Sequence, residues 1–128
     1  MNQIDLTGTW IQEIPSSLDQ FEKTDIVECK QESDKLEGVI KRLLPESERF
    51  RRWEFSARIA ENLTFGIFWP KDELKNPHSY GAFHLNILSG SYLEGFLLEF
   101  ICAENDQPPS FTGTYKQWPV KWKKRATM

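Results

Sequence analysis

The chain has 128 residues, of which 39% are hydrophobic, 13% aromatic and 27% charged. This length is typical of one domain, and the aromatic content excludes a disordered or low-complexity chain. No apolar run reaches the roughly 18 residues that a membrane-spanning helix needs, and the N-terminus lacks the basic and apolar regions of a signal peptide. We therefore expect a soluble, cytoplasmic protein that does not insert into membranes.

The formal net charge is −3 at pH 7, but the charges are unevenly distributed. No acidic residue follows Asp106, whereas several lysines and an arginine do. A predominantly acidic body excludes the broad basic surface with which proteins bind DNA or RNA polymers. We divide the chain into one β-barrel domain, residues 1–118, and a basic C-terminal tail, residues 119–128, which is expected to be a solvated chain end.

Alternation of apolar and polar residues, with β-branched and aromatic enrichment, predicts one strand after another along the chain. Turn-forming residues such as Pro15-Ser16-Ser17 and Lys75-Asn76-Pro77 separate these segments. The predicted strands cover residues 7–14, 23–32, 35–44, 49–60, 63–70, 80–89, 92–104 and 110–118. A short helical turn is expected within residues 15–21, because Ser17 suits the start of a helix. The pattern is that of an all-β antiparallel meander.

A repeated unit, a leucine followed two or three residues later by a glycine, opens every second predicted strand, and its period is the length of one hairpin. Alternate strands of a meander start at the same end, so the repeated glycines are expected to lie near one rim and to allow sharp bends there. These structural glycines are Gly8, Gly38, Gly66 and Gly95. The arrangement favours a closed eight-stranded up-and-down barrel with Trp10 buried at the glycine end, and a two-sheet sandwich is the alternative.

The two-residue period of a strand predicts which side chains face the barrel interior. Most of the predicted inward set is apolar, but several polar and aromatic side chains are expected to converge in the lumen. The predicted inward residues of the strand 63–70 are Leu63, Phe65, Ile67 and Trp69, and those of the last strand are Phe111, Gly113, Tyr115 and Gln117. The candidate ligand-binding residues are Gln12, Arg42, Arg51, Trp53, Trp69, Glu99, Tyr115 and Gln117. They would either form a ligand pocket or pair with one another and fill the barrel. A one-residue shift in register would replace Arg51 by Arg52 and Glu99 by Leu98.

The predicted strand 92–104 is apolar on both faces. One of these faces is therefore expected to be covered by the helical turn, by the C-terminal tail or by a second copy of the chain. A homodimer is the simplest of the assemblies that a second copy would form.

The triplet Gly8-Thr9-Trp10 resembles the lipocalin G-x-W signature, in which the tryptophan closes the floor of the barrel. This resemblance implies a cation–π contact between the tryptophan and a basic residue after the last strand, here Lys121, Lys123 or Arg125. Pro119 interrupts the last predicted strand. The segments around Trp10 and Tyr115 are also similar to the two ends of avidins, although the middle of the chain is not.

A longer series of motifs resembles the lipocalin-like sensor barrel of the membrane-permeabilising effectors in bacterial CBASS antiphage systems. The series is Gly8-x-Trp10, Val27-x-Cys29-x-Gln31, Leu36-x-Gly38, Trp53-x-Phe55, Leu63 to Trp69, Ser79-x-Gly81-x-x-x-Leu85 and Leu93-x-Gly95. In these effectors the barrel captures a cyclic oligonucleotide and two transmembrane helices permeabilise the membrane. No such helices are found in this sequence, so the resemblance covers the sensor barrel alone.

No catalytic motif is present, and two histidines and two cysteines are too few for a metal cluster, so we expect neither an enzyme nor a cofactor. The expected function is the binding of a small molecule, with a cyclic nucleotide as the favoured ligand. Arg42 and Arg51 would bind phosphate, whereas Trp53, Trp69 and Tyr115 would stack on bases. Gln12 and Gln117 would hydrogen-bond base edges or ribose. A carrier of an apolar ligand and a ligandless protein-interaction barrel are the alternatives.

Overall fold

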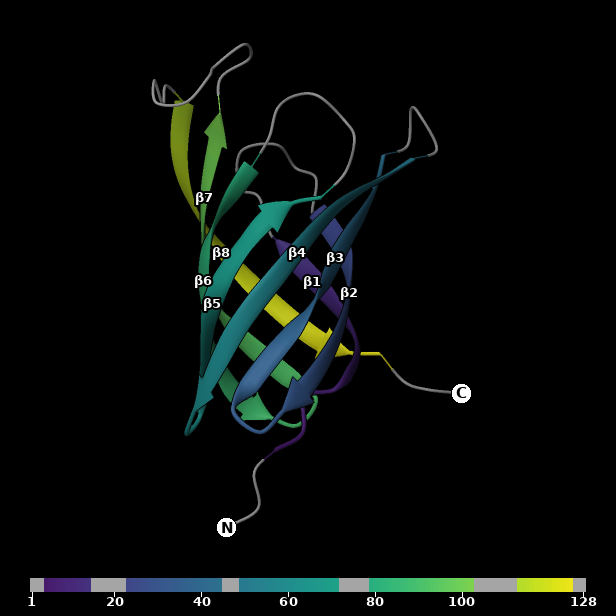
Figure 1. Cartoon of the computed structure of the whole chain (residues 1–128), viewed down its shortest axis with the longest axis vertical. Coiled ribbons are helices and arrows are strands. Elements are labelled where there is room, and N and C mark those ends of the chain that lie inside the picture. Colours follow the sequence, from purple (N-terminus) through teal and green to yellow (C-terminus); the bar gives the residue numbers. More distant parts are fainter. Residues whose placement is uncertain (1–3, 15–22, 45–48, 72–78, 103–112, 126–128) are drawn as a thin grey trace.

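The computed structural model describes residues 4–14, 23–44, 49–71, 79–102 and 113–125, with only the backbone described at several strand ends. The strands are β1 (Gly8–Ile14), β2 (Lys23–Glu32), β3 (Lys35–Leu44), β4 (Arg49–Ala60), β5 (Leu63–Pro70), β6 (Ser79–Ser89), β7 (Tyr92–Cys102) and β8 (Gly113–Lys124). Each strand pairs antiparallel with its neighbours in the chain, and β1 pairs with β8 (Figure 1). The closed barrel confirms the predicted all-β, eight-stranded antiparallel fold.

The helical turn predicted for residues 15–21 lies outside the described residues. Among the residues that are described, no helix is long and apolar enough to cross a membrane.

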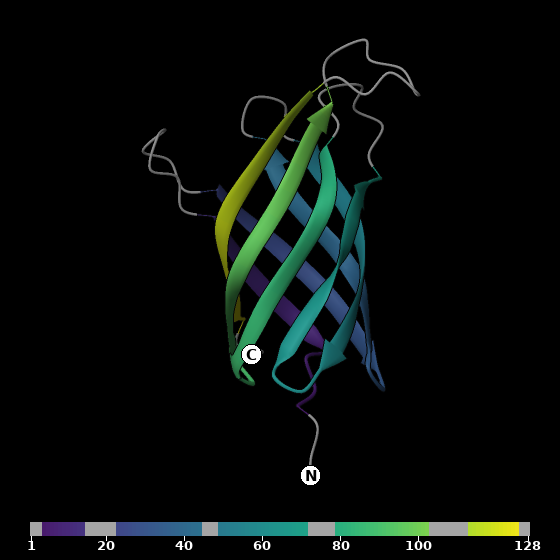
Figure 2. The same ribbon diagram turned by 90° about the vertical axis from the view of Figure 1, so that its left-hand side faces the viewer.

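The two ends of the barrel differ, and the difference is visible in both ribbon views (Figures 1 and 2). At one end, the hairpin end, two-residue turns join β2 to β3, β4 to β5 and β6 to β7. Ser33 and Glu61 in the first two turns have φ angles of 58° and 55°, the left-handed region that suits tight hairpins between twisted strands. The opposite end, the loop end, is where β1, β3, β5 and β7 finish.

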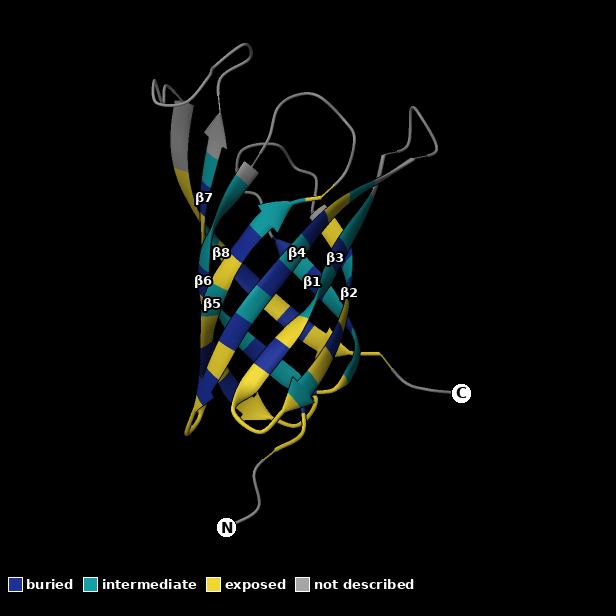
Figure 3. Ribbon diagram, in the orientation of Figure 1, coloured by how far each residue is buried: buried dark blue, intermediate teal, exposed yellow. Residues whose placement is uncertain are grey.

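Burial alternates along most strands as the two-residue period predicts (Figure 3). In β1, β3, β4, β6 and β7 the expected inward residues line the interior. The apolar ones that are buried there are Leu6, Trp10, Leu36, Ile40, Trp53, Phe55, Ala57, Phe83, Leu85, Ile87, Leu93 and Leu97.

The prediction for β5 was wrong by one residue. Thr64 and Phe68 are buried, whereas the expected inward residues Phe65 and Ile67 are 43% and 57% exposed. The cause is the two-residue turn, which pairs the buried Ile59 directly with Thr64. Directly paired residues share one face of a sheet. The hairpin, and not the alternation of apolar side chains, therefore determines which residues of β5 face inward.

The prediction for β8 was wrong in register and in length. Val120 and Trp122 are buried and Gln117 is exposed, so the even-numbered residues face inward in the described part of β8. The strand continues through Pro119 to Lys124, and residues 119–124 therefore belong to the barrel and not to a tail. Proline is tolerated at this point because the pairing of β8 with β1 covers residues 121–124 only.

Aromatic rings fill the interior near the hairpin end. The Trp122 ring lies 6.1 Å from Trp10, 5.7 Å from Phe55 and 6.0 Å from Phe83, measured between ring centroids. Trp10 is fully buried and donates its indole N–H to the carbonyl oxygen of Leu6 at 2.9 Å. The Nζ of Lys124 lies 5.7 Å from the Trp10 ring centroid. The cation on the tryptophan is therefore Lys124 and not one of the three residues that the lipocalin resemblance implied.

The glycine repeat marks positions where neighbouring strands approach closely. A Cβ atom added to Gly95 would collide with the carbonyl oxygen of His84 and would lie 2.8 Å from Cα of Leu85. A Cβ added to Gly90, in the β6–β7 turn, would meet only the side chain of Ile4, at 3.8 Å.

The Gly95→Ala substitution should lower the free energy of unfolding by about 1–3 kcal/mol, because the β6 and β7 backbones must move apart to admit the methyl group. Gly90→Ala is the matched control and should change it by less than about 0.5 kcal/mol. Urea unfolding followed by far-UV circular dichroism measures both values. Equal effects of the two substitutions would contradict the close-approach explanation.

The thiol of Cys29 lies near the buried Trp10 and, like its indole, donates a hydrogen bond to the carbonyl oxygen of Leu6, at 3.1 Å. Burial raises the pKa of this free thiol to about 11. The side chain of Cys102 lies outside the described residues.

Cys29 should resist alkylation by iodoacetamide at pH 8 in the native protein, because only roughly a thousandth of a thiol with this pKa is ionised at that pH. In urea the thiol regains an ordinary pKa and should react readily. Peptide mass spectrometry separates the Cys29 peptide from that of Cys102. Rapid labelling of native Cys29 would contradict its described burial.

Candidate ligand site at the loop end of the lumen

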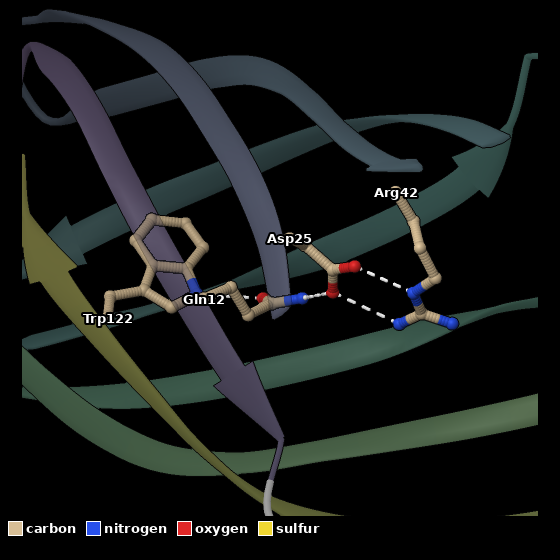
Figure 4. A network of polar contacts seen from close by, with 4 residues as sticks. All are labelled: Gln12, Asp25, Arg42 and Trp122. Carbon is tan, nitrogen blue, oxygen red and sulfur yellow. Dashed lines mark hydrogen bonds and ion pairs between the residues drawn. The ribbon is translucent and has the colours of Figure 1, made fainter. Parts of the chain in front are cut away.

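A chain of hydrogen bonds runs along the inner wall of the barrel, from β8 through β1 and β2 to β3, and begins at Trp122 of the aromatic cluster (Figure 4). The indole N–H of Trp122 donates to Oε1 of Gln12 at 2.8 Å, and Nε2 of Gln12 donates to Oδ2 of Asp25 at 2.8 Å. Arg42 then donates from Nε to Oδ1 of Asp25 at 2.6 Å and from Nη2 to Oδ2 at 3.0 Å. Each polar group thus has a defined donor or acceptor role, as a buried polar network requires.

Burial changes along this chain toward the loop end. The side chain of Asp25 is 0% exposed, whereas that of Arg42 is 21% exposed. A buried carboxylate requires a counter-charge, and the two-point contact with a planar guanidinium supplies it. The contact also fixes the orientation of Arg42, whose Nη1 points away from the carboxylate (Figure 4).

The face of the Arg42 guanidinium is covered on one side by an indole ring. Its Cζ lies 5.1 Å from the ring centroid of Trp53, within the range of a cation–π contact. Arg51 lies directly opposite Arg42 in the β3–β4 ladder and therefore on the same face of the sheet. On the other side of the lumen, Glu99 is buried and accepts a hydrogen bond from the indole N–H of Trp118 at 3.2 Å.

A cavity of about 20 Å³ lies among these groups. Its lining combines the polar chain with apolar side chains and consists of Gln12, Ile14, Asp25, Ile40, Arg42, Trp53, Phe68, Leu97 and Glu99. This volume is room for one water molecule. The space between the described residues is therefore too small for a nucleotide, and a larger ligand would have to bind above it, at the loop end.

Of the eight predicted site residues, four line this cavity: Gln12, Arg42, Trp53 and Glu99. Arg51 lies beside them on the lumen face, as its register with Arg42 shows. Two were placed wrongly, because the register of β5 puts Trp69 on the outer face and that of β8 leaves Gln117 exposed outside. The side chain of Tyr115 lies outside the described residues.

Sequence reasoning missed Asp25, the residue that holds the polar chain together. The two-residue period would have found it, because the buried Val27 and Cys29 share its parity. Arg42 forms its ion pair with Asp25 and not with another of the predicted lumen residues. In the part of the chain that the structure describes, no group of three His, Cys, Asp or Glu side chains could hold a metal ion.

The Arg42→Met substitution should lower the free energy of unfolding by about 3 kcal/mol, because it leaves the carboxylate of Asp25 buried without a counter-charge. The double variant Asp25→Asn/Arg42→Met should lose clearly less, since no ion is then buried. Urea unfolding followed by tryptophan fluorescence measures both. A larger loss in the double variant than in Arg42→Met would show that the buried charge is not the cause.

Comparison with known proteins adds no further constraint on this site. Neither a protein-family model, nor a curated protein, nor a solved structure matches the chain.

Proposed function

We propose that the barrel binds a small molecule at the loop end of its lumen without changing it chemically, and that the ligand is a cyclic nucleotide. On this proposal the protein is a cytoplasmic receiver of a nucleotide signal. The resemblance to the sensor barrel of CBASS effectors extends the proposal to a role in antiviral defence.

The observation that carries the proposal is the pair of arginines on the lumen face near the loop end. Arg42 and Arg51 are directly opposed in neighbouring strands, so both side chains lie on the same face of the sheet. An anionic group placed at the loop end would accept charge-assisted hydrogen bonds from both guanidinium groups. Asp25 uses Nε and Nη2 of Arg42, so the phosphate would bind Nη1 of Arg42 together with Arg51.

The stacking surface for a base is the guanidinium of Arg42 and not the indole of Trp53 itself. Trp53 is only 5% exposed, and Arg42 lies over its ring. Bases stack on arginine planes as well as on aromatic rings, and a guanidinium held rigidly by Asp25 loses little entropy when a base stacks on it. This differs from the sequence-based expectation, which assigned stacking to three aromatic side chains.

The charges nearby limit how much anionic charge the site can accept. Two buried carboxylates, Asp25 and Glu99, line the same cavity as Arg42. They disfavour a second phosphate deep in the lumen, so the proposal is one phosphate near the two arginines and the remainder of the ligand nearer the loop end. An apolar carrier function is less well supported, because such a ligand would remove the partly exposed, charged guanidinium of Arg42 from water without offering it a polar contact.

Isothermal titration against a panel of cyclic mono-, di- and trinucleotides should detect binding, and Arg51→Ala should weaken it by about 1.5–3 kcal/mol. Arg52→Ala is the matched control, because the neighbouring Arg52 lies on the outer face and should leave the affinity unchanged. No heat at about 100 μM ligand, together with uptake of a fatty-acid or retinoid probe, would overturn the proposal in favour of an apolar carrier.

A further inference from the structure

The outer surface of β5, β6 and β7 carries adjacent apolar side chains in two rows that cross the strands. Phe65, His84 and Phe96 are paired across the three strands, and the next row contains Ile67, Ala82 and Leu98. We define these six residues as the apolar face. Figure 2 views the barrel from the side on which these strands lie next to one another.

The apolar face is exposed and contains no acidic or strongly basic side chain. Ile67 is 57% exposed, and Phe65, Phe96 and Leu98 are each 43% exposed. The outer surface of β2 and β3, by contrast, carries exposed charged residues such as Glu28, Lys30 and Glu37. The largest contiguous exposed apolar patch of a protein is often a functional surface.

The shape of the apolar face, with a hollow and a projecting side chain, suits contact with the same face of a second copy of the chain. A hollow of about 280 Å³ lies over Ala82, Phe96 and Leu98 and is bordered by Gln117 of β8. The exposed side chain of Ile67 projects from β5, directly opposite Ala82. In a two-fold symmetric interface the same patch is used by both copies, so a projection beside a hollow can fit its own copy twice. A two-fold axis along β6 would set β5 of one copy against β7 of the other, with the small Ala82 at the centre.

The charged border of the face agrees with this occupant. The apolar face by itself is smaller than the roughly 800 Å² per partner that a standard interface buries. The contact would therefore extend onto the neighbouring strands, where Arg58 lies beside Phe65 and Glu94 lies beside Lys121. Charges of both signs at the border favour a copy of the same chain over a strongly basic or acidic partner.

We infer that the protein forms a two-fold symmetric homodimer through the outer face of β5, β6 and β7. The inference is independent of the proposed ligand site, which faces the interior of the barrel.

Sedimentation equilibrium of the full chain between about 1 and 100 μM should give twice the monomer mass of 15.0 kDa at the upper concentrations. Ile67→Glu and Leu98→Glu, on two different strands, should each raise the dissociation constant at least about tenfold. Leu88→Glu is the matched control, because Leu88 is equally exposed, at 56%, but lies outside the apolar face. Far-UV circular dichroism checks that all three variants keep the sheet.

A parent protein that stays monomeric throughout this range would overturn the inference, as would variants of the apolar face that still dimerise. Loss of the dimer in Leu88→Glu as well would overturn the assignment to this face. Flotation of a monomeric parent with phosphatidylcholine vesicles, abolished by Ile67→Glu, would assign the face to a lipid surface instead.

Discussion

Closure of the barrel rests on the short ladder between Trp10–Glu13 of β1 and Lys121–Lys124 of β8. This ladder places Lys124 over the ring of Trp10 and Lys123 within 3.4 Å of the Glu13 carboxylate. It also sets Trp122 directly opposite Gln12, from which the polar chain of the lumen begins. The aromatic filling of the hairpin end and the orientation of the polar groups above it both depend on this closure.

The polar chain connects the strand that closes the barrel, β8, to the guanidinium of Arg42 and so fixes the position of that cation. Trp122 can only donate, so Gln12 must present its carbonyl to the indole and its amide to Asp25. Asp25 in turn accepts from two guanidinium nitrogens and holds Arg42 flat above Trp53. A side chain with many rotamers is thereby held in one orientation, which is the preorganisation that a binding site requires.

The sequence predicted the strands and their closed order well, because turn residues and the hairpin-length glycine repeat are local signals. The inward sets of β1, β3, β4 and β6 were also predicted, since there one face is clearly more apolar than the other. β7 is apolar on both faces, and its inward set was predicted from the position of its Leu93-x-Gly95 unit. β5 is apolar on both faces, and its register follows from the pairing of Ile59 with Thr64. The parity of Val27 and Cys29 points Asp25 inward, but an acidic residue is ordinarily expected in solvent unless a partner such as Arg42 is placed beside it.

The hydrogen bond between Trp122 and Gln12 joins residues that are 110 positions apart in the chain. The hairpins from β2 to β7, by contrast, pair residues that are close in sequence and can form early. Pairing of β1 with β8 closes the longest loop of the chain and therefore has the largest cost in conformational entropy. It is expected to come late in folding. Until β1 and β8 meet, two unpaired strand edges are open to other chains, so the speed of this last step sets how long the nascent protein is exposed to aggregation.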